Sequence, residues 1–414
     1  MKNITHFSIK KKLLAVLMLI TFLFLLLGIR LFWVQIVDGN SLQLKAFDQW
    51  TRDLPMRADR GDIVDCNGIV LASSKTTFTL YGRPNEISDP HYIAVSIAEI
   101  VGKDVETLSK ILSKKGVSEI TVAKNLSKSQ FKQLSTININ GLYVTADSAR
   151  NYPYGDYLTQ VLGFTNVDGV GQSGVEQYYD KYLKGVDGQS LTQTDLIGKK
   201  LRDNVTTYLP SKKGATTQLT IDFYMQNFVE KAIKNVVATY NPRGASCIIM
   251  NANSGEIKSM YSYPSYDLNN PPRNDKELLL KGARNGLVSD AYEPGSTFKI
   301  LTSAIGMEEN KIKKSYYCNG GSIVDGQRIK CWRSIGHGSQ TFEQGIHNSC
   351  NCVFMDIAQS VGVKKMYEYL QNFGIGKKTN VDILGEAKGI VLKEKNVKPV
   401  DIARIGFGQA IAVT

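Results

Sequence analysis

The feature that most constrains this 414-residue sequence is an uncharged apolar run close to its N-terminus. The run extends over 17 residues from Leu13 to Ile29 and continues, past Arg30, to Val37. A helix needs about 20 apolar residues to cross a bilayer, and an arginine near its end can extend its charged head to the membrane surface. We therefore predict a single transmembrane anchor over residues 13–37. A cleaved signal peptide is the alternative, but no small-residue cleavage pattern follows the run.

Charge on the two sides of the apolar run predicts the orientation of the chain. The first twelve residues carry four lysines, at positions 2, 10, 11 and 12. Because positively charged flanks stay on the cytoplasmic side, residues 1–12 are expected to form a cytoplasmic tail and the rest of the chain to be extracytoplasmic. The formal net charge of +12 suits an anionic membrane surface or an acidic polymer. No Arg-rich helix or zinc-finger spacing accompanies that charge, so nucleic acid is not an expected partner.

Turn and linker residues predict two domains beyond the anchor. Residues 40–55 read as a helix that leads into a first domain over residues 50–212. Asn67-Gly68 between two apolar runs is a strong β-hairpin pattern in that domain. After the linker Ser211-Lys212-Lys213-Gly214, residues 215–414 read as an α+β domain. In it we expect a short strand, a helix capped by Asp222, and a hairpin over residues 244–262. A helix is expected to follow near residue 300.

A candidate nucleophile lies at the start of that last helix. The turn Pro294-Gly295 precedes Ser296-Thr297-Phe298-Lys299, which places the serine and the lysine one helical turn apart on the same face. A desolvated lysine can accept the proton of a serine hydroxyl, and the helix N-terminus stabilises negative charge at the serine. The alternative is a serine cap beside a solvated lysine. The pattern is weak by itself, because Ser8 to Lys11 and Ser129 to Lys132 repeat it.

A second motif makes the first one specific. Ser349-Cys350-Asn351 lies 53 residues after Ser296, just before an apolar helical run. Together the two motifs resemble those of the penicillin-binding proteins, the active-site-serine peptidoglycan transpeptidases. Three upstream motifs are similar to those of the class B members: Arg60-Gly61-x-Ile63-x-Asp65-x-Asn67-Gly68, Arg150-x-Tyr152-Pro153 and Gly171-x-x-Gly174-Val175-Glu176. Within class B, the chain is most similar to the sporulation-specific (stage V) and division-type members.

The resemblance implies a fold and a reaction. The fold would be α+β: a membrane anchor, a mixed α/β pedestal (dimerisation) domain over residues 50–212, and a transpeptidase domain over 215–414 with helices on both sides of an antiparallel sheet. The reaction would cross-link stem peptides ending in D-Ala-D-Ala, β-lactams would acylate the same serine, and catalysis would require no cofactor. A membrane glycosyltransferase would be a partner. The roles implied for the site residues are nucleophile for Ser296, general base for Lys299, proton relay for Ser349 and substrate-amide contact for Asn351.

The third motif of the family, Lys-Thr/Ser-Gly, is not found in the sequence. Lys378-Thr379-Asn380 lacks the glycine and lies too close to Ser349. We therefore expect this chain to stop inside its catalytic domain. Two alternatives to an active enzyme follow: an inert interaction protein of the wall-synthesis complex, built on residues 1–215, and a β-lactam-sensing receptor. Such receptors normally have several membrane spans, whereas this sequence predicts one.

The cysteines form a separate candidate site. Four of the six fall within 35 residues, and Cys318, Cys331, His337 and Cys350 are separated by 12, 5 and 12 residues. Three sulfurs and one imidazole suit a structural tetrahedral zinc ion, and the resemblance implies a zinc site in this stretch. A disulfide between Cys318 and Cys331 and a set of unlinked core cysteines are the alternatives. The spare candidate ligands are Cys352 and His347.

Overall fold

The computed structural model describes residues 6–39, 41–42, 51–117, 119–137, 139–194 and 200–414. The chain divides into two compact units, each assembled from separate stretches. The first unit comprises Met1–Asp59, Thr76–Ser148 and Gly185–Lys213, and the second comprises Arg60–Lys75, Ala149–Lys184 and Gly214–Thr414. The chain therefore leaves the first unit for the last time near the predicted linker. Two earlier stretches of the predicted pedestal domain belong to the second unit.

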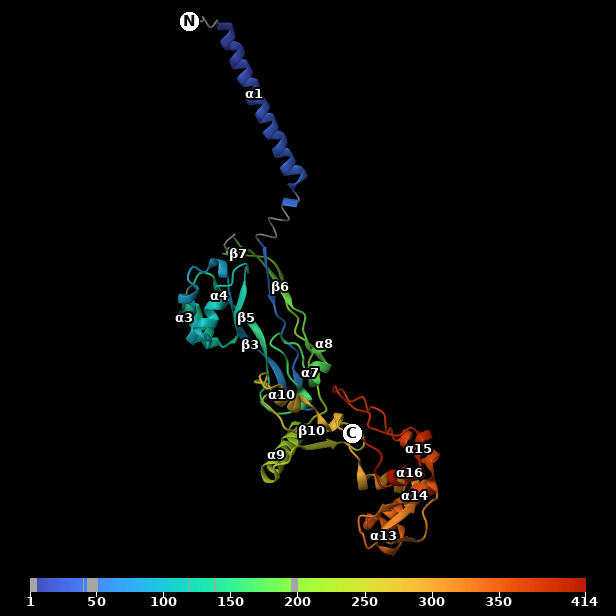
Figure 1. The fold of residues 1–414 in the computed structure, drawn as a ribbon. Coiled ribbons are helices and arrows are strands. Elements are labelled where there is room, and N and C mark those ends of the chain that lie inside the picture. The colour runs from blue at the N-terminus through green and yellow to red at the C-terminus, as the bar shows by residue number, and fades with distance from the viewer. Residues whose placement is uncertain (1–5, 40, 43–50, 118, 138, 195–199) are drawn as a thin grey trace. The chain divides into compact units, whose positions relative to one another are not determined.

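The N-terminal part of the first unit is one long helix (Figure 1). Helix α1 spans His6–Phe32 and continues as a π-helical turn, η1, over Trp33–Val37. Lys11–Val37 is the one helix in the described part of the chain that is long and apolar enough to cross a membrane. The predicted anchor falls inside this segment. Residues 1–5 of the predicted cytoplasmic tail lie outside the described residues.

The prediction of a helix over residues 40–55 is wrong at its C-terminal end. Thr51–Met56 form strand β1, which pairs antiparallel with β6 (Gly188–Thr194), and β6 in turn pairs with β7 (Lys200–Leu209). Pro55 lacks the N–H that a helix interior needs, which favours the extended form. Residues 40 and 43–50 of the predicted helix lie outside the described residues.

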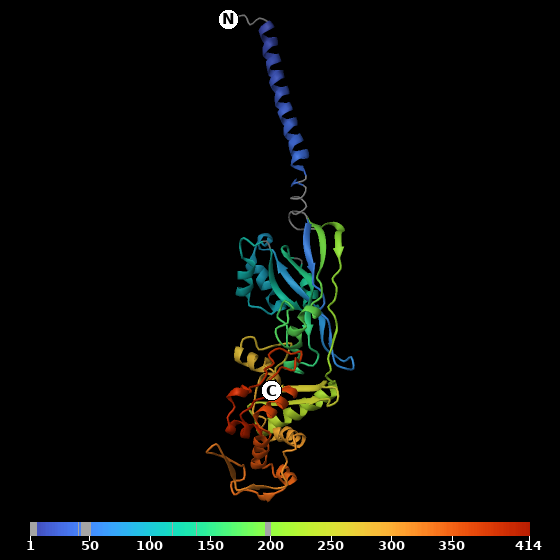
Figure 2. The ribbon, with the colours of Figure 1, turned by 90° about the vertical axis from the view of Figure 1, so that its right-hand side faces the viewer.

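The remainder of the first unit is an α/β layer. Strand β3 (Val70–Gly82) pairs antiparallel with β4 (Ile120–Leu126) over its second half and also pairs with β5 (Leu142–Asn151). Helices α3 and α4 lie on the same side of β3 and β5 in both views (Figures 1 and 2). The helices are α3 (Pro90–Val101), α4 (Val105–Leu112) and α5 (Lys128–Thr136), each with a capping Asp or Ser. Their apolar faces and β3–β4 enclose one buried core.

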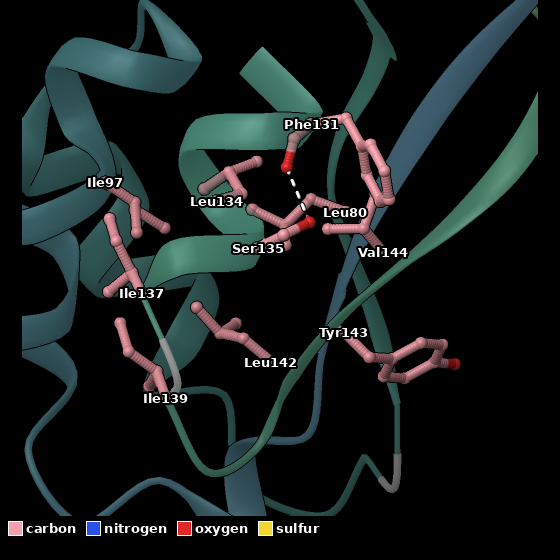
Figure 3. Close-up of a pocket in the computed structure, with 10 residues that line it drawn as sticks. All are labelled: Leu80, Ile97, Phe131, Leu134, Ser135, Ile137, Ile139, Leu142, Tyr143 and Val144. Atoms are coloured by element: carbon pink, nitrogen blue, oxygen red, sulfur yellow. Dashed lines mark hydrogen bonds between the residues drawn. The ribbon is translucent and has the colours of Figure 1, made fainter. Parts of the chain in front are cut away.

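This core is open at one point, between α5 and β5 (Figure 3). Apolar side chains from α3, α5, β3 and β5 surround a hollow of about 190 Å³. Small-molecule sites usually measure about 300–1,000 Å³, so the hollow is below that range. The Ser135 hydroxyl points into the helix and donates to the Phe131 carbonyl oxygen at 2.7 Å. The hollow therefore reads as a shallow packing gap between elements of the first unit.

The second unit is held together at Glu176, whose side chain is fully buried. Arg60 Nε and Arg150 Nε each lie 2.5 Å from one of its two carboxylate oxygens. Arg60 also pairs with Asp180 at 2.7 Å and donates to the carbonyl oxygen of Glu176. The three upstream sequence motifs thus meet at one carboxylate. Glu176 lies in α7 (Gly174–Tyr178), which is flanked by α6 (Thr159–Leu162) and α8 (Asp180–Leu183).

The hairpin predicted at Asn67-Gly68 is confirmed. Strand β2 (Ile63–Val64) pairs antiparallel with the first half of β3, and Gly68 adopts the positive φ of +87° that this turn requires. The buried Asp65 carboxylate accepts from the backbone N–H of Asn67, Ile69 and Phe223. It therefore joins the hairpin to the first residue of α9. Strand β8 (Thr217–Gln218) pairs parallel to β2, and α9 spans Phe223–Tyr240.

The predicted elements after residue 215 are also found. Asp222 caps α9 through the N–H of Tyr224 and Met225. Strands β9 (Ala245–Met250) and β10 (Ile257–Tyr263) form the expected antiparallel hairpin. The fold class is therefore mixed α and β, as the sequence predicts.

Buried residues between Phe298 and Ile411 form one core around α14 (Asn351–Val361), which is buried along most of its length. Helices α12 (Lys299–Glu308) and α16 (Pro399–Ile405) contact it, and α14, α15 and α16 lie together in Figure 1. The other elements of this core are η3 (Gly295–Phe298), β11 (Tyr316–Cys318), β12 (Gly321–Val324), β13 (Gln327–Lys330), β14 (Gly338–Gln340), α13 (Phe342–His347) and α15 (Val363–Asn372). Two helices before it, α10 (Lys276–Ala283) and α11 (Gly286–Ser289), contact α6 and the β9–β10 hairpin, respectively.

We expect Glu176→Gln to destabilise the second unit strongly. The substitution keeps the size of the side chain but leaves the buried Arg150 guanidinium without its counter-charge and Arg60 with Asp180 alone. Removing one partner of a buried ion pair costs about 3–5 kcal/mol. The measurement is the thermal unfolding midpoint of the full chain in detergent. In the control, Glu277→Gln breaks a pair with Lys281 in which both side chains are more than 60% exposed, and a change below about 1 kcal/mol is expected. Equal shifts for the two variants would contradict the prediction.

Candidate active site

The predicted nucleophile lies on a tight turn at the start of a buried helix. Ser296 belongs to the 3-10 turn η3, which runs directly into α12. Its side chain is exposed, whereas Phe298 and Lys299 are only 6% and 5% exposed. The Ser296 hydroxyl therefore faces outward, whereas the Lys299 side chain of the same motif points into the protein.

Lys299 joins the first motif to the second. Its Nζ lies 2.8 Å from the Ser349 carbonyl oxygen, 2.7 Å from Asn351 Oδ1 and 3.1 Å from Ser349 Oγ. A neutral amine has two N–H donors and one lone pair. The two carbonyl-type oxygens can only accept, so they take two N–H donors, and the third contact, to the Ser349 hydroxyl, is the one that can reverse when the amine loses its proton. This arrangement fits a lysine that exchanges protons with its neighbours.

Burial sets the proton affinity of Lys299. It lowers the pKa of the side chain to about 8, because an ammonium group loses hydration in the core. Negative charge on Cys331 and Cys350 opposes the effect and raises the pKa. An ordinary lysine titrates at about 10.4. Near neutral pH the deprotonated form of Lys299 is therefore far more accessible than that of a surface lysine.

The second motif is fixed by backbone geometry. Ser349 has a φ of +46°, a left-handed conformation that is uncommon for any residue but glycine. Cys350 follows as the N-cap residue of α14, and Asn351 is the first residue of that helix. The Asn351 side-chain amide donates to the Lys330 carbonyl oxygen at 3.4 Å while its oxygen accepts from Lys299. Strain of this kind is commonly found at functional sites.

The motif residues line one hollow of about 350 Å³, within the size range of ligand sites. Ser296, Ser349 and Asn351 lie on its wall, and Lys299 reaches it through its contacts with the second motif. The structure thus brings together all four predicted catalytic residues. Three further lining residues were missed as site residues by the sequence analysis: Trp332, Phe407 and Gln409.

Trp332 lines the same hollow with a side chain that is largely exposed. Its side chain is 65% exposed although it is large and apolar, and its indole N–H donates to the Asn348 carbonyl oxygen at 3.0 Å. His337 lies against the ring, with centroids 5.4 Å apart. A tryptophan held rigidly beside a nucleophile offers a flat apolar surface to a ligand. Its proximity depends on the folding of residues 318–340, which no local pattern in the sequence reveals.

The cysteine cluster differs from the predicted ligand set in one member. The sulfurs of Cys318, Cys331, Cys350 and Cys352 lie within 4.8 Å of one another, and all four residues are buried. The predicted fourth member, His337, is not part of this sulfur group; its Nδ1 lies 3.8 Å from the Cys331 sulfur. Cys350 is the N-cap residue of α14 and Cys352 lies in its first turn, and both contribute sulfurs to the group.

The cluster has the chemistry of a metal site. A tetrahedral zinc site has Zn–S bonds of about 2.3 Å, so its sulfurs are about 3.8 Å apart. The spacing observed here needs only a small contraction. All six cysteines lie in the described part of the chain and are free thiols, so the predicted Cys318–Cys331 disulfide is not present. A hydrogen bond from Cys352 lowers the pKa of the Cys350 thiol, whereas burial raises the pKa of the Cys331 thiol.

Two family descriptions match most of the chain. The penicillin-binding protein dimerisation domain matches residues 55–219, and the penicillin-binding protein transpeptidase domain matches residues 245–414. Over its full length the chain is 37% identical to the stage V sporulation protein D of Bacillus subtilis (strain 168). The chain belongs to the class B penicillin-binding proteins. This places it in a family of transpeptidase enzymes, as the motifs predicted.

Two further similarities are at lower sequence identity. The peptidoglycan D,D-transpeptidase FtsI of Escherichia coli (strain K12) is 26% identical over 94% of the chain. The chain spans 64% of the length of the Bacillus relative and 66% of FtsI. Among solved structures, the complex between penicillin-binding protein 2 and MreC from Helicobacter pylori contains a similar fold. It has a TM-score of 0.72 at 22% identity and covers 88% of this chain and 74% of that one.

Proposed function

We propose that this class B penicillin-binding protein is a membrane-anchored peptidoglycan D,D-transpeptidase that acts through an acyl-serine intermediate. One observation carries the proposal: a desolvated lysine is hydrogen-bonded to Ser349 and Asn351, and both of these residues line the same hollow as the exposed Ser296. A stem peptide ending in D-Ala-D-Ala is the proposed substrate, and β-lactams are proposed to react at the same serine. No cofactor takes part in these steps.

In the first half-reaction, Lys299 accepts the proton of the Ser296 hydroxyl as the oxygen attacks the carbonyl carbon of the penultimate D-Ala. The backbone N–H of Ser296 donates to the oxyanion that forms; one such donor is worth about 3–4 kcal/mol in other enzymes. The C–N bond then breaks, and the terminal D-Ala leaves with a proton relayed through Ser349. The Asn351 side chain hydrogen-bonds the peptide amide of the substrate and fixes its direction.

The second half-reaction reverses the proton transfers. An amine of a second stem peptide attacks the ester, gives up a proton through Ser349 and Lys299, and forms the new amide as Ser296 regains its hydrogen. Splitting one difficult exchange into two easier steps is the advantage of covalent catalysis. The net result exchanges one amide bond for another, so no external energy source is needed.

The proposed location follows from the N-terminal helix. Residues 13–37 would anchor the chain in the cell membrane, residues 1–12 would be cytoplasmic, and the two domains, 50–212 and 215–414, would be extracytoplasmic. The length and apolar character of Lys11–Val37 support a single pass. A membrane glycosyltransferase that makes the glycan strands is the proposed partner, in either spore-cortex or septum synthesis.

We also propose that the four clustered cysteines hold a structural zinc ion. Four sulfur ligands leave no open position, so the ion would stabilise residues 318–352 and would not enter the reaction. The mutual distances and burial of the sulfurs support this ligand set, with Cys352 in place of His337.

The catalytic assignment predicts covalent labelling by penicillin. A labelled penicillin is expected to mark the full chain in detergent and to leave Ser296→Ala unmarked, as seen after denaturing gel electrophoresis. Ser289→Ala, a change at a serine outside the hollow, is the matched control and should be marked like the wild type. Labelling of Ser296→Ala would exclude this serine as the nucleophile. A folded wild-type chain that takes no label would favour the inert interaction protein instead.

The pKa of Lys299 predicts the pH dependence of acylation. Only the neutral amine can accept the serine proton, so the acylation rate should rise with pH and level off above the pKa of about 8. Below that pH the rate should fall about tenfold per pH unit, because each unit reduces the neutral fraction tenfold. Stopped-flow labelling between pH 6 and pH 9 measures the profile. A rate that is flat over this range would contradict Lys299 as the base.

The zinc proposal predicts a measurable metal content. Elemental analysis of the purified full chain should find one zinc ion per chain, and Cys352→Ser should lose most of it. His337→Ala should retain the ion, because the imidazole lies outside the sulfur group. Cys66→Ser, at a cysteine outside the cluster, controls for the loss of a thiol. Absence of zinc from the wild type, or its loss in His337→Ala alone, would contradict the ligand set.

A further inference from the structure

The segment that follows α16, Gly406–Val413, runs beside the stretch that leads into the nucleophile turn. The two form backbone hydrogen bonds at both ends of their contact. Tyr292 and Val413 exchange two N–H···O bonds of 2.9 Å, and the Gly295 N–H donates to the Gly408 carbonyl oxygen at 2.9 Å. Gly295 is the residue immediately before Ser296. The backbone of the nucleophile turn is therefore tied to a segment more than 100 residues later in the chain.

Gly408 permits the closest part of this contact. Its φ is +81°, and a Cβ atom at this position would lie 2.1 Å from the Gly295 carbonyl oxygen and 2.8 Å from its carbonyl carbon and nitrogen. Real Cβ atoms do not approach backbone atoms so closely. A side chain at position 408 would therefore have to displace the peptide of Gly295, and with it Ser296.

Glu293 makes a second tie from the other side. Its carboxylate accepts from the Ala410 N–H at 2.9 Å, and Ala410 has a φ of +58°. Glu293 is exposed and lies three residues before the nucleophile, so it does not reach the reacting atoms. Its hydrogen bond holds the left-handed turn at Ala410, which lies two residues after Gly408.

The later segment is itself anchored in the core. The buried Thr302 hydroxyl, from the middle of α12, donates to the Gly406 carbonyl oxygen at 2.8 Å. A Cβ atom on Gly406 would lie 2.5 Å from the Phe354 carbonyl oxygen of α14, so the backbone there packs directly on that helix. The segment is thus fixed to α12 and α14, the two helices that carry Lys299 and Asn351.

We infer that Gly406–Val413 is a clamp that sets the position of Ser296 relative to Lys299, with Gly408 and Glu293 as positioning residues. Phe407 and Gln409, which line the active-site hollow, belong to the same clamp, so it also shapes the wall that faces the substrate. The effect of the clamp on the reaction rate rests on the proposed function, whereas its effect on the backbone position of Ser296 does not.

The first test compares two glycine substitutions. Gly408→Ala and Gly385→Ala impose the same unfavourable φ, +81° and +88°, but a Cβ at Gly385 meets no atom within 4 Å. Displacement of a reacting group by about 1 Å can cost about 100-fold in rate. We therefore expect Gly408→Ala to lower the acylation rate constant for a labelled penicillin by at least tenfold. Gly385→Ala should acylate like the wild type, with an unchanged dissociation constant of the non-covalent complex.

The second test uses a conservative pair at Glu293. Glu293→Gln keeps an oxygen that accepts from the Ala410 N–H, whereas Glu293→Ala removes the acceptor. Acylation by Glu293→Gln should stay close to the wild-type rate, and Glu293→Ala should be slower by about tenfold, in line with loss of one positioning hydrogen bond. A purely electrostatic role for Glu293 would make the two variants equally slow, which would exclude it as a clamp residue.

Amide hydrogen exchange of the full chain separates the clamp from the chemistry. In Gly408→Ala, peptides covering residues 292–296 and 409–413 should exchange at least tenfold faster than in the wild type, with no such change in Gly385→Ala. If the wild type takes no penicillin label, the proposed function fails while this measurement still tests the clamp. Unchanged exchange at residues 292–296 in Gly408→Ala overturns the inference whatever the labelling.

Discussion

The second unit depends on one buried carboxylate. Glu176 has no exposed surface and pairs with two arginines that come from separate stretches of the chain. An unpaired charge at that depth would cost several kcal/mol, so each of the three groups is stable only while the others are in place. The constraint is therefore cooperative: residues 60–75 and 149–184 must join the body formed by residues 214–414 together. Their apolar residues share one core cluster with it.

A second case of burial governs the chemistry. Lys299 loses most of its hydration because α12 packs against α14, and the acceptors that remain are the oxygens of Ser349 and Asn351. The helix packing thus does two things at once: it lowers the pKa of the amine and it orients the amine toward the second motif. An exposed lysine at position 299 would be charged at neutral pH and would direct its hydrogen bonds to water. Burial of Lys299 in the core therefore sets both the pKa of its amine and its hydrogen-bond partners.

Local patterns in the sequence were sufficient to predict several helices and turns and to locate the motif residues. Asn67-Gly68, the Asp222 cap and the helix after Ser296 depend on nearest neighbours, and all were found. The spacing of Ser296, Lys299 and Ser349 became informative through the family resemblance. Trp332 and Gln409 were missed as site residues, and Cys352 was named only as a spare ligand, because only long-range folding brings them to their sites. Proline in Thr51–Met56 was a local signal that the helix prediction there overlooked.

The cysteine cluster and the second motif occupy the same turn. Cys350 lies between Ser349 and Asn351, is the N-cap residue of α14 and is fully buried, with its sulfur in the cysteine cluster, whereas the Ser349 and Asn351 side chains contact Lys299. Ser349 can keep its left-handed φ only if the residues on either side are held. A rigid set of sulfur contacts on one side and the α14 hydrogen bonds on the other supply that hold. The cluster can thus determine where Ser349 lies without any contact with the substrate.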